Sequence, residues 1–231
     1  MERNVQRLEV LGGRSVYGVD QHRVLRNTYW LLALSMLPTV LGAWIGVQTG
    51  VFAHLGPVAS LLVFFGGAFG LMFGIRHFRD SAVGVFMLLG FTFFMGLMLS
   101  RLLSFILGFS NGPSLIMLAF GGTGIIFASM ATIATVSKRD FSGLGKWLFM
   151  GVIVILLAAF ANVFLQLPAL MLTVSVLAIV IFSAYMLFDV QRVVNGGETN
   201  YISAALAIYL DLYNVFTNLL ALLGIFGGNR N

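Results

Sequence analysis

Seven long apolar stretches constrain the fold of this chain more than any other feature of its sequence. A membrane-spanning helix needs about 20 predominantly apolar residues to cross roughly 30 Å of hydrocarbon. Six nearly charge-free stretches of this length are followed by a seventh, more polar one: 28–47, 57–75, 81–100, 114–136, 147–166, 169–188 and 201–226. Because the backbone has no water to bond at that depth, and because the stretches are far longer than barrel strands, each is predicted to be a helix.

The composition agrees with this interpretation. Of the 231 residues, 59% are hydrophobic and 9% are charged, and the mean hydropathy is +0.99, which is unlike a soluble domain of this size. The sequence therefore predicts an all-α integral membrane protein with seven transmembrane helices. We expect an N-terminal tail at 1–27, a single membrane domain at 28–226 and a short C-terminal tail at 227–231.

The basic residues are distributed unevenly between the two sides of the predicted bundle. With the N-terminus in the cytoplasm, eleven of the thirteen Lys and Arg fall in cytoplasmic segments, and only Arg101 and Arg230 fall outside. This distribution follows the positive-inside rule, and it accounts for the net charge of +5 without a nucleic-acid partner. The N-terminus is therefore predicted to be cytoplasmic. Seven full crossings place the C-terminus on the other side, whereas a re-entrant last segment would return it to the cytoplasm.

Small residues at helical spacing predict where the helices pack. Gly66, Gly70 and Gly74 lie four residues apart in the second stretch, and Gly124 and Ala128 do the same in the fourth. Small residues at this spacing let two helices approach closely. We therefore expect both sets to serve packing inside the bundle.

Two aspartates break the apolar pattern of the last two stretches and are the first candidates for a functional site. Asp189 lies just after the sixth stretch, and Asp211 lies within the seventh. A carboxylate far from water costs about 2.5–3.5 kcal/mol on insertion scales, so acids inside a membrane usually face a cavity or a partner. A carboxyl group is also easier to protonate in such surroundings. Two of them in one site can therefore respond to pH.

The seventh stretch carries further polar residues on one face. Asp211, Asn214 and Asn218 are spaced three and four residues apart, so they share a helix face that is unsuited to lipid. We therefore expect the seventh helix inside the bundle, surrounded by the other six, with this face toward a hydrated pocket. For Asn214 and Asn218 the alternative is a set of hydrogen bonds between helices that holds the bundle together.

Asp189 is expected near the cytoplasmic end of the sixth helix, where the backbone carbonyl groups disfavour a negative charge. It therefore needs a cation, a hydrogen-bond partner or a proton, and Arg192, Arg76 and Arg79 are all predicted at the same membrane face. An ion pair with Arg192 at i+3 is one interpretation. A contact with Asp211 is another, since the expected depths of the two acids differ by roughly 8 Å, which tilt or a dipping loop can close.

A contact between the two acids would have a direct chemical consequence. One proton shared between the carboxyl groups keeps the site neutral, and the pair then titrates as a unit. Loss of that proton leaves two charges that repel each other, or that attract an arginine or Ca²⁺, whose preferred ligands are oxygen atoms. Asp189 and Asp211 are therefore the predicted pH sensor and gate, and the residues predicted to bind calcium if any do.

The remaining residues do not suggest an enzyme or a bound cofactor. His22, His54 and His77 have no spacing typical of a metal site, there is no cysteine, and no serine has a catalytic context. Intramembrane aspartyl proteases also place one Asp on each of two neighbouring helices, and their Pro-Ala-Leu motif occurs here at 168–170. In those enzymes the motif follows both acids, whereas here it precedes them. We therefore expect a protein that is not an enzyme.

Several motifs resemble those of the transmembrane Bax inhibitor motif family, also called the Bax inhibitor-1 family. The family-wide resemblance lies in SAYMLFD at 183–189 and LAIYLDLYNVF at 206–216. Three further segments resemble the bacterial YccA-like branch of the family: VLRNTY at 24–29, NVFLQLPAL at 162–170 and GGETNYI at 196–202. The resemblance covers nearly the whole chain.

The resemblance implies a fold and a site. It implies six helices around a central C-terminal seventh, and a di-aspartyl pH sensor at Asp189 and Asp211. In the family an arginine at the cytoplasmic end of the second helix latches the first acid, and Arg76 and Arg79 are the two candidates here. The residues predicted to line the pore or pocket are Tyr185, Tyr209, Asn214 and Asn218.

The resemblance also implies two functions. Members of the family are associated with a pH-sensitive Ca²⁺ leak, and this chain keeps both aspartates, which some YccA-like members lack. The leading hypothesis is therefore a pH-sensitive, calcium-permeable leak channel of the bacterial inner membrane. The YccA-like branch is associated with binding and modulating the membrane ATP-dependent protease FtsH. The alternative is therefore a binding partner of that protease, which it would contact through the charged segment 1–27. The lipid bilayer is the other expected partner.

Overall fold

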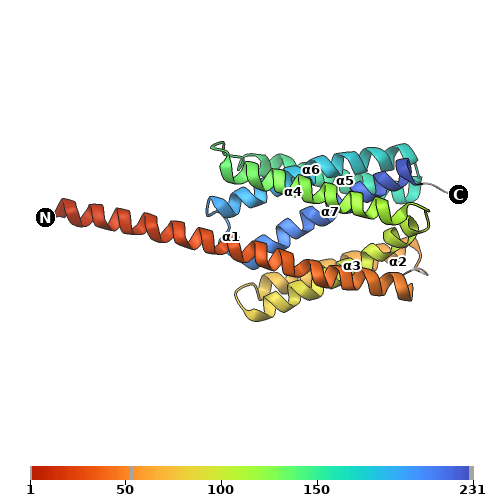
Figure 1. Ribbon diagram of the computed structural model, residues 1–231, viewed down its shortest axis with the longest axis horizontal. Coiled ribbons are helices and arrows are strands. Elements are labelled where there is room, and N and C mark those ends of the chain that lie inside the picture. The colour runs from red at the N-terminus through yellow and green to blue at the C-terminus, as the bar shows by residue number, and fades with distance from the viewer. Residues whose placement is uncertain (1, 53–54, 229–231) are drawn as a thin grey trace.

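The chain folds into seven long α-helices joined by short connections (Figure 1). A computed structural model describes residues 2–52 and 55–228, except for the side chains of residues 2–20 and of residue 57. The helices are α1 (Glu2–Thr49), α2 (Pro57–His77), α3 (Ala82–Leu107), α4 (Gly112–Val136), α5 (Leu144–Leu165), α6 (Pro168–Val194) and α7 (Tyr201–Gly227). All seven are long and apolar enough to cross a membrane. The predicted class, an all-α integral membrane protein with seven spanning helices, is thereby confirmed.

A few sequence-based predictions concern parts of the chain outside this description. His54 and residues 229–231 of the predicted C-terminal tail, Arg230 included, lie outside the described residues. The side chains of Arg3, Arg7 and Arg14, which count among the basic residues of the predicted N-terminal tail, are also outside it.

Helix α1 is longer than the first predicted stretch. It begins at Glu2 and continues to Thr49, and its membrane-spanning part begins at Gln21 rather than near residue 28. The sequence has no proline between residues 2 and 28 that would end a helix there. In Figure 1 the N-terminal part of α1 extends beyond the other six helices.

Prolines set the beginnings of three helices. Pro57, Pro113 and Pro168 stand in the first turns of α2, α4 and α6, where a missing N–H is harmless because these groups have no partner within the helix. Asn162 closes the turn before α6, since its side-chain oxygen accepts a hydrogen bond from the backbone N–H of Leu167 at 2.9 Å. The short α5–α6 connection therefore makes these two helices antiparallel neighbours.

Helix α7 packs against more neighbours than any other helix. It contacts α1, α2, α3, α4 and α6, whereas α5 packs against α6. The fully buried side chains of α7 include Ile208, Tyr209 and Val215. They lie in or beside a core to which α1 and α3 contribute Leu31 and Phe91. The helix that carries Asp211 is thus held from several sides.

The backbones of α1 and α3 approach each other closely at two glycines. A Cβ atom added to Gly96 would collide with the backbone oxygen of Thr39, and one added to Gly42 would collide with the backbone oxygen of Phe93. Glycine at both positions therefore lets the two backbones touch, in the way small residues act in membrane helix pairs.

The predicted packing role of the small residues in α2 and α4 is wrong for most of them. Nothing lies within 4 Å of a Cβ atom added to Gly66, Gly70 or Gly124, and Ala128 is exposed. Only Gly74 faces a neighbouring helix, through the side chain of Met87. The spacing of small residues identifies one face of a helix, but it does not say whether another helix of the same chain covers that face.

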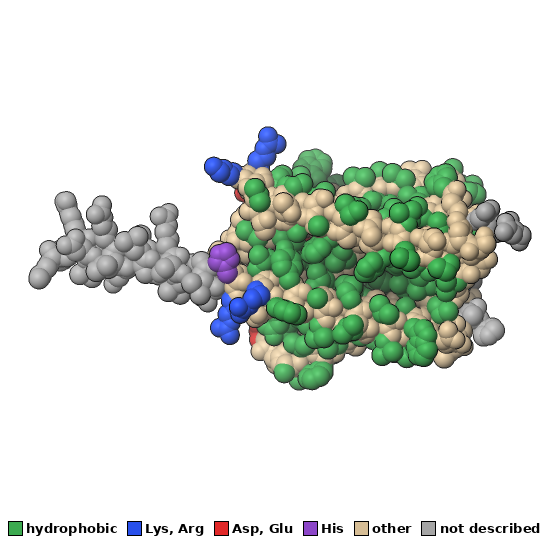
Figure 2. Space-filling view, viewed as in Figure 1, with side chains coloured by type: hydrophobic (Ala, Val, Ile, Leu, Met, Phe, Trp, Pro, Cys, Tyr) green, Lys and Arg blue, Asp and Glu red, His purple; other side chains and the backbone are tan. Residues whose placement is uncertain are grey.

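The surface has an apolar flank and a basic end. Figure 2 shows hydrophobic side chains over the long sides of the bundle and Lys and Arg side chains at one end. The C-terminal ends of α2, α4 and α6 lie at that end, with Arg76, Lys138 and Arg192. Arg101 lies at the opposite end, where its guanidinium group donates to the hydroxyl of Ser60. Which end faces the cytoplasm stays a prediction.

Candidate functional site

A tight turn makes α6 and α7 antiparallel neighbours. Helix α6 ends at Val194, and Gly196 follows with φ of +76°, a backbone conformation that glycine adopts without strain. The N–H groups of Gly197 and Glu198 then donate to the backbone oxygen of Arg192, at 2.8 and 3.1 Å. The chain therefore reverses within six residues, and α7 runs back beside α6.

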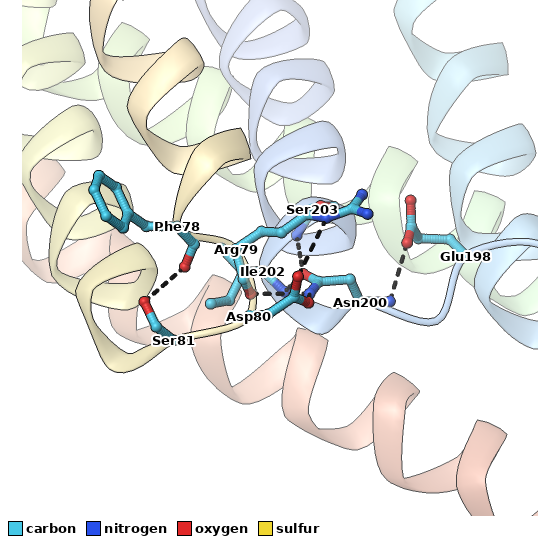
Figure 3. Close-up of polar contacts among 8 residues, drawn as sticks. All are labelled: Phe78, Arg79, Asp80, Ser81, Glu198, Asn200, Ile202 and Ser203. Carbon is cyan, nitrogen blue, oxygen red and sulfur yellow. Dashed lines mark hydrogen bonds and ion pairs between the residues drawn. The ribbon is translucent and has the colours of Figure 1, made fainter.

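Asn200 fixes the start of α7 and ties it to a second loop (Figure 3). Its side-chain oxygen accepts from the backbone N–H groups of Ile202 and Ser203, both at 3.0 Å, which is the arrangement of an N-cap. Its amide nitrogen donates to the backbone oxygen of Arg79 at 2.9 Å and to the carboxylate of Asp80 at 2.8 Å. The cap of α7 therefore also holds the α2–α3 connection.

The two helices bring Asp189 and Asp211 together. Their carboxyl groups lie close enough to each other to share a proton, and both residues are buried, with exposed fractions of 9% and 4%. The Oδ2 atom of Asp211 is buried without a hydrogen-bond partner. The expected difference in depth is therefore closed by the way α6 and α7 cross.

Arg192 lies between two carboxyl groups. Its guanidinium nitrogens are 3.7 Å from Oδ1 of Asp189 and 3.6 Å from Oε2 of Glu198, and the group also lies over the ring of Phe188, 5.7 Å from the centroid. The ion pair at i+3 that the sequence suggested is therefore present. It does not make Asp189 a surface residue, because Asp189 stays buried behind it.

The contact between the acids requires a proton. Two negative charges side by side and away from water would repel each other strongly, so one carboxyl group must donate to the other. Arg192 lies 3.7 Å from Asp189 and favours a negative charge there. The arrangement therefore suits a pair in which Asp211 carries the proton and Asp189 is paired with the half-exposed cation.

The two predicted pocket-lining tyrosines have different surroundings. Tyr185 is partly buried on α6, one turn before Asp189, and its ring contacts those of Phe182 and Phe188. Tyr209 is fully buried, and its hydroxyl group lies 2.9 Å from the hydroxyl of Thr39 on α1. Tyr185 therefore lies on the same helix as Asp189, whereas Tyr209 faces α1 and α3.

The two predicted asparagines form hydrogen bonds within their own helix. The amide nitrogen of Asn214 donates to the backbone oxygen of Leu210, and that of Asn218 donates to the backbone oxygen of Asn214, both at 2.8 Å. These nitrogens therefore do not join α7 to another helix. That Asn214 and Asn218 line a hydrated pocket stays a prediction.

The predicted latch residues lie at the same end of the bundle as Asp189. Arg76 and Arg79 are both exposed, and the guanidinium group of Arg79 pairs with Asp80 at 3.7 Å. The guanidinium group that contacts Asp189 belongs to Arg192. A latch formed by Arg76 or Arg79 stays a prediction for another state of the site.

The Pro-Ala-Leu tripeptide lies far from the acid pair. Pro168 is the first residue of α6, and Asp189 is near the other end of that helix, about 30 Å away at 1.5 Å per residue. The tripeptide therefore does not contribute to a site with the two acids.

Two residues of this region escaped the sequence analysis. Glu198 is the second partner of Arg192, and Gln191 is buried, with both ends of its amide group bonded to the α4–α5 connection. The sequence could have predicted the role of Glu198, since an acid six residues after an arginine can form an ion pair with it across a turn. It could not have predicted the role of Gln191, because an uncharged residue at the end of a helix does not break an apolar pattern.

The fold and the site define a class: a polytopic helical membrane protein with two contacting acids on its last two helices. Among known proteins, a family model described as "Inhibitor of apoptosis-promoting Bax1" matches residues 21–228. The chain belongs to this Bax inhibitor-1 family, as its motifs implied.

Several bacterial proteins of similar length are also similar in sequence to this chain. The chain is 37% identical to the Escherichia coli K12 protein named "Modulator of FtsH protease YccA", over 89% of this chain and 91% of the relative. The same figures hold for the protein of Escherichia coli O6:H1 named "Inner membrane protein YccA". An "Uncharacterized membrane protein" of Vibrio cholerae is 34% identical, over 91% of this chain and 93% of the relative.

Proposed function

We propose that this chain is a bacterial inner-membrane protein that binds and modulates the membrane-bound ATP-dependent protease FtsH. The observation that carries this proposal is the 37% identity to the protein named "Modulator of FtsH protease YccA", which extends over nearly the full length of both chains. The seven helices long and apolar enough to cross a membrane are compatible with a partner of a membrane-bound protease. The charged segment before Gln21, where the first spanning part begins, and the loops of the basic end are the parts that we propose contact the protease outside the bilayer.

Co-purification tests this proposal directly. A tagged full-length chain, isolated from native membranes in mild detergent, is expected to carry FtsH with it, whereas a variant that lacks residues 2–20 is expected to carry much less. The truncation leaves the membrane-spanning part from Gln21 onward intact. A variant that lacks residues 229–231 is the matched control and is expected to behave as the full-length chain.

A functional readout completes the test. The degradation rate of a membrane substrate of FtsH is expected to change when the chain is added to the purified protease in proteoliposomes. An unchanged rate, together with no co-purification from native membranes, would refute the proposal.

A second function is favoured by a different observation, the contact between Asp189 and Asp211. We propose that the same protein conducts Ca²⁺ in a pH-dependent manner, with these acids as the gate. The buried and unpartnered Oδ2 atom of Asp211 supports this proposal, since carboxylate oxygens are preferred ligands of Ca²⁺. Two carboxyl groups offer fewer oxygens than the six to eight that Ca²⁺ takes, so the site suits a passing ion better than a resident one.

Calcium flux in proteoliposomes tests this second function. The wild-type chain is expected to conduct more when the shared proton is lost at higher pH, since the two carboxylates then repel each other. Asp211→Asn keeps the size of the side chain and a hydrogen-bond donor, so its flux is expected to be low and independent of pH. Equal flux in both proteins at every pH would exclude the acid pair as a gate.

A further inference from the structure

A pocket of ≈200 Å³ lies beside the acid pair at the basic end of the bundle. One wall is the last part of α6, with Phe188, Gln191 and Arg192, and another is the α4–α5 connection, with Asp140 and Ser142. We call this space the loop pocket. Its volume is large enough for several water molecules, and both walls carry polar groups.

Gln191 fastens the outer wall of the loop pocket to α6. Its Oε1 atom accepts from the backbone N–H of Phe141 at 2.6 Å, and its Nε2 atom donates to the backbone oxygen of Arg139 at 2.7 Å. The side chain is only 4% exposed, so solvent competes little for these bonds. One buried amide group therefore holds the middle of the α4–α5 connection in place.

The α4–α5 connection is also ordered within itself. Ser142 donates its backbone N–H and its hydroxyl to the carboxylate of Asp140, at 2.8 and 3.0 Å. These two hydrogen bonds hold the pKa of Asp140 below its ordinary value of 3.8, and the bond from the backbone N–H has the larger effect. Asp140 therefore contributes a negative charge to the lining of the loop pocket, opposite the positive charge of Arg192.

Arg192 separates the loop pocket from the acids. It lines the pocket and also lies 3.7 Å from Asp189, so it belongs to both sites. Its side chain is 42% exposed, whereas that of Asp189 is 11% exposed. Arg192 also pairs with Glu198 at 3.6 Å, so it has a second acidic partner if it leaves Asp189.

We propose that the loop pocket is the aqueous entrance to the acid pair, with Gln191 as the clamp that keeps it narrow and Arg192 as its inner barrier. Water, protons and small inorganic cations then reach Asp189 first and Asp211 behind it. The inference deepens the second proposed function by giving its site a route to one membrane face. The route can exist without ion conduction, so its test does not measure conduction.

The charged groups around Asp189 are compatible with such a route. Asp211 comes from α7, Arg192 and the neutral Tyr185 from α6 itself, and Glu198 from the α6–α7 turn. The other charged or titratable side chains described at this end are exposed and belong to neighbouring elements: His22, Arg23 and Arg26 of α1, Arg76 and His77 of α2, Arg79 and Asp80 of the α2–α3 connection, Lys138, Arg139 and Asp140 of the α4–α5 connection, and Lys146 of α5.

Chemical modification of Asp189 tests the clamp. A water-soluble carbodiimide with glycinamide, applied to the full-length chain in nanodiscs, modifies carboxyl groups that water reaches, and peptide mass spectrometry gives the rate at Asp189. Each hydrogen bond of Gln191 is worth a factor of about 2 to 10 in the closed-to-open ratio. Gln191→Leu is therefore expected to raise the rate at Asp189 by about tenfold, since opening limits access.

A matched control separates the clamp from general loosening. Asn162 also fastens a connection through its side-chain amide group, at the opposite end of the bundle. Asn162→Leu is expected to leave the rate at Asp189 unchanged. An unchanged rate in Gln191→Leu, or an equal rise in both variants, would overturn the proposal.

Blocking the pocket gives a second test that leaves the clamp intact. The chain has no cysteine, so Ser142→Cys provides a single thiol on the exposed wall of the loop pocket. A bulky maleimide on that thiol is expected to lower the carbodiimide rate at Asp189 several-fold. The same reagent on Ser81→Cys, an exposed site at the same end outside the pocket, is expected to have no effect. A rate at Asp189 that is unaffected by the blocked Ser142→Cys variant would show that access takes another route.

Discussion

At the scale of single residues, the hydroxyl groups of Tyr209 and Thr39 form a polar contact between α7 and α1 in the interior of the bundle. They lie 2.9 Å apart, and the Tyr209 hydroxyl also reaches the backbone oxygen of Thr92 on α3 at 3.4 Å. Tyr209 is 1% exposed, so water cannot replace a lost partner. This contact therefore helps to fix the register of the helix that carries Asp211.

We predict that Tyr209→Phe lowers the free energy of unfolding by about 1 kcal/mol, the net worth of a typical hydrogen bond. Thr39→Val is expected to cost a similar amount, and the double variant less than the sum, because both substitutions remove the same bond. Denaturant unfolding in detergent measures these values. Thr49→Val, at the exposed end of α1, is the control and should add to Tyr209→Phe. Full additivity of Tyr209→Phe and Thr39→Val would show that the contact contributes nothing.

Asn200 caps α7 and also binds the α2–α3 connection, and substitutions can separate these two roles. Asn200→Asp keeps the acceptor that caps α7 but loses the donor to Arg79 and places a second carboxylate beside Asp80. Asn200→Ala loses both tasks, and loss of an N-cap costs about 1 kcal/mol. We predict that both variants are destabilised in thermal unfolding, Asn200→Asp through the loop contact alone. A wild-type melting temperature in Asn200→Asp would show that the tie to the α2–α3 connection is weak.

At the scale of helices, the structure separates glycines that pack from glycines that face outward. We predict that Gly96→Ala and Gly42→Ala each cost more than about 2 kcal/mol, because the added Cβ atom meets backbone rather than a movable side chain. Gly66→Ala and Gly70→Ala, where the space is open, should be neutral or stabilising by up to about 1 kcal/mol through helix propensity. Unfolding in increasing SDS compares the four variants. Equal losses at all four positions would mean that the outward glycines are covered in the membrane.

This contrast also shows what the sequence could and could not predict about the helices. Hydropathy is a property of each residue, so a sum over about 20 residues locates a spanning helix well, and each predicted stretch falls on one of the seven helices, although α1, α3 and α6 extend beyond theirs. Packing depends on which face meets which neighbour. The spacing of Gly66 and Gly70 therefore gave a wrong prediction of packing. Gly42 and Gly96 do approach the backbone of a neighbouring helix, but their positions in the sequence do not show that α1 and α3 meet there.

At the scale of the whole molecule, the same distinction applies to the candidate site. Asp189 and Asp211 could be found from the sequence because a charge in an apolar stretch is a rare signal. Their contact was one of two interpretations, and the predicted depths alone could not decide between them, because the contact depends on the crossing of α6 and α7. The role of Gln191 could not be predicted for a related reason. Its partners are backbone groups of a connection some 50 residues earlier in the chain, and nearly every residue type has the same backbone groups, so the sequence does not identify them.

The orientation of the bundle decides which compartment the loop pocket faces, and it is a prediction of the whole molecule. Eleven of thirteen Lys and Arg belong to segments on the side predicted to be cytoplasmic, and this bias sets the orientation of membrane proteins. The absence of cysteine lets single thiols report it: Ser81→Cys lies at the basic end, and Gly56→Cys at the opposite end in open space. An impermeant maleimide is expected to label Gly56→Cys in intact cells and Ser81→Cys only after permeabilisation. Labelling of Ser81→Cys in intact cells would show that the bundle has the opposite orientation. The loop pocket and Asp189 would then be reached from outside the cell rather than from the cytoplasm.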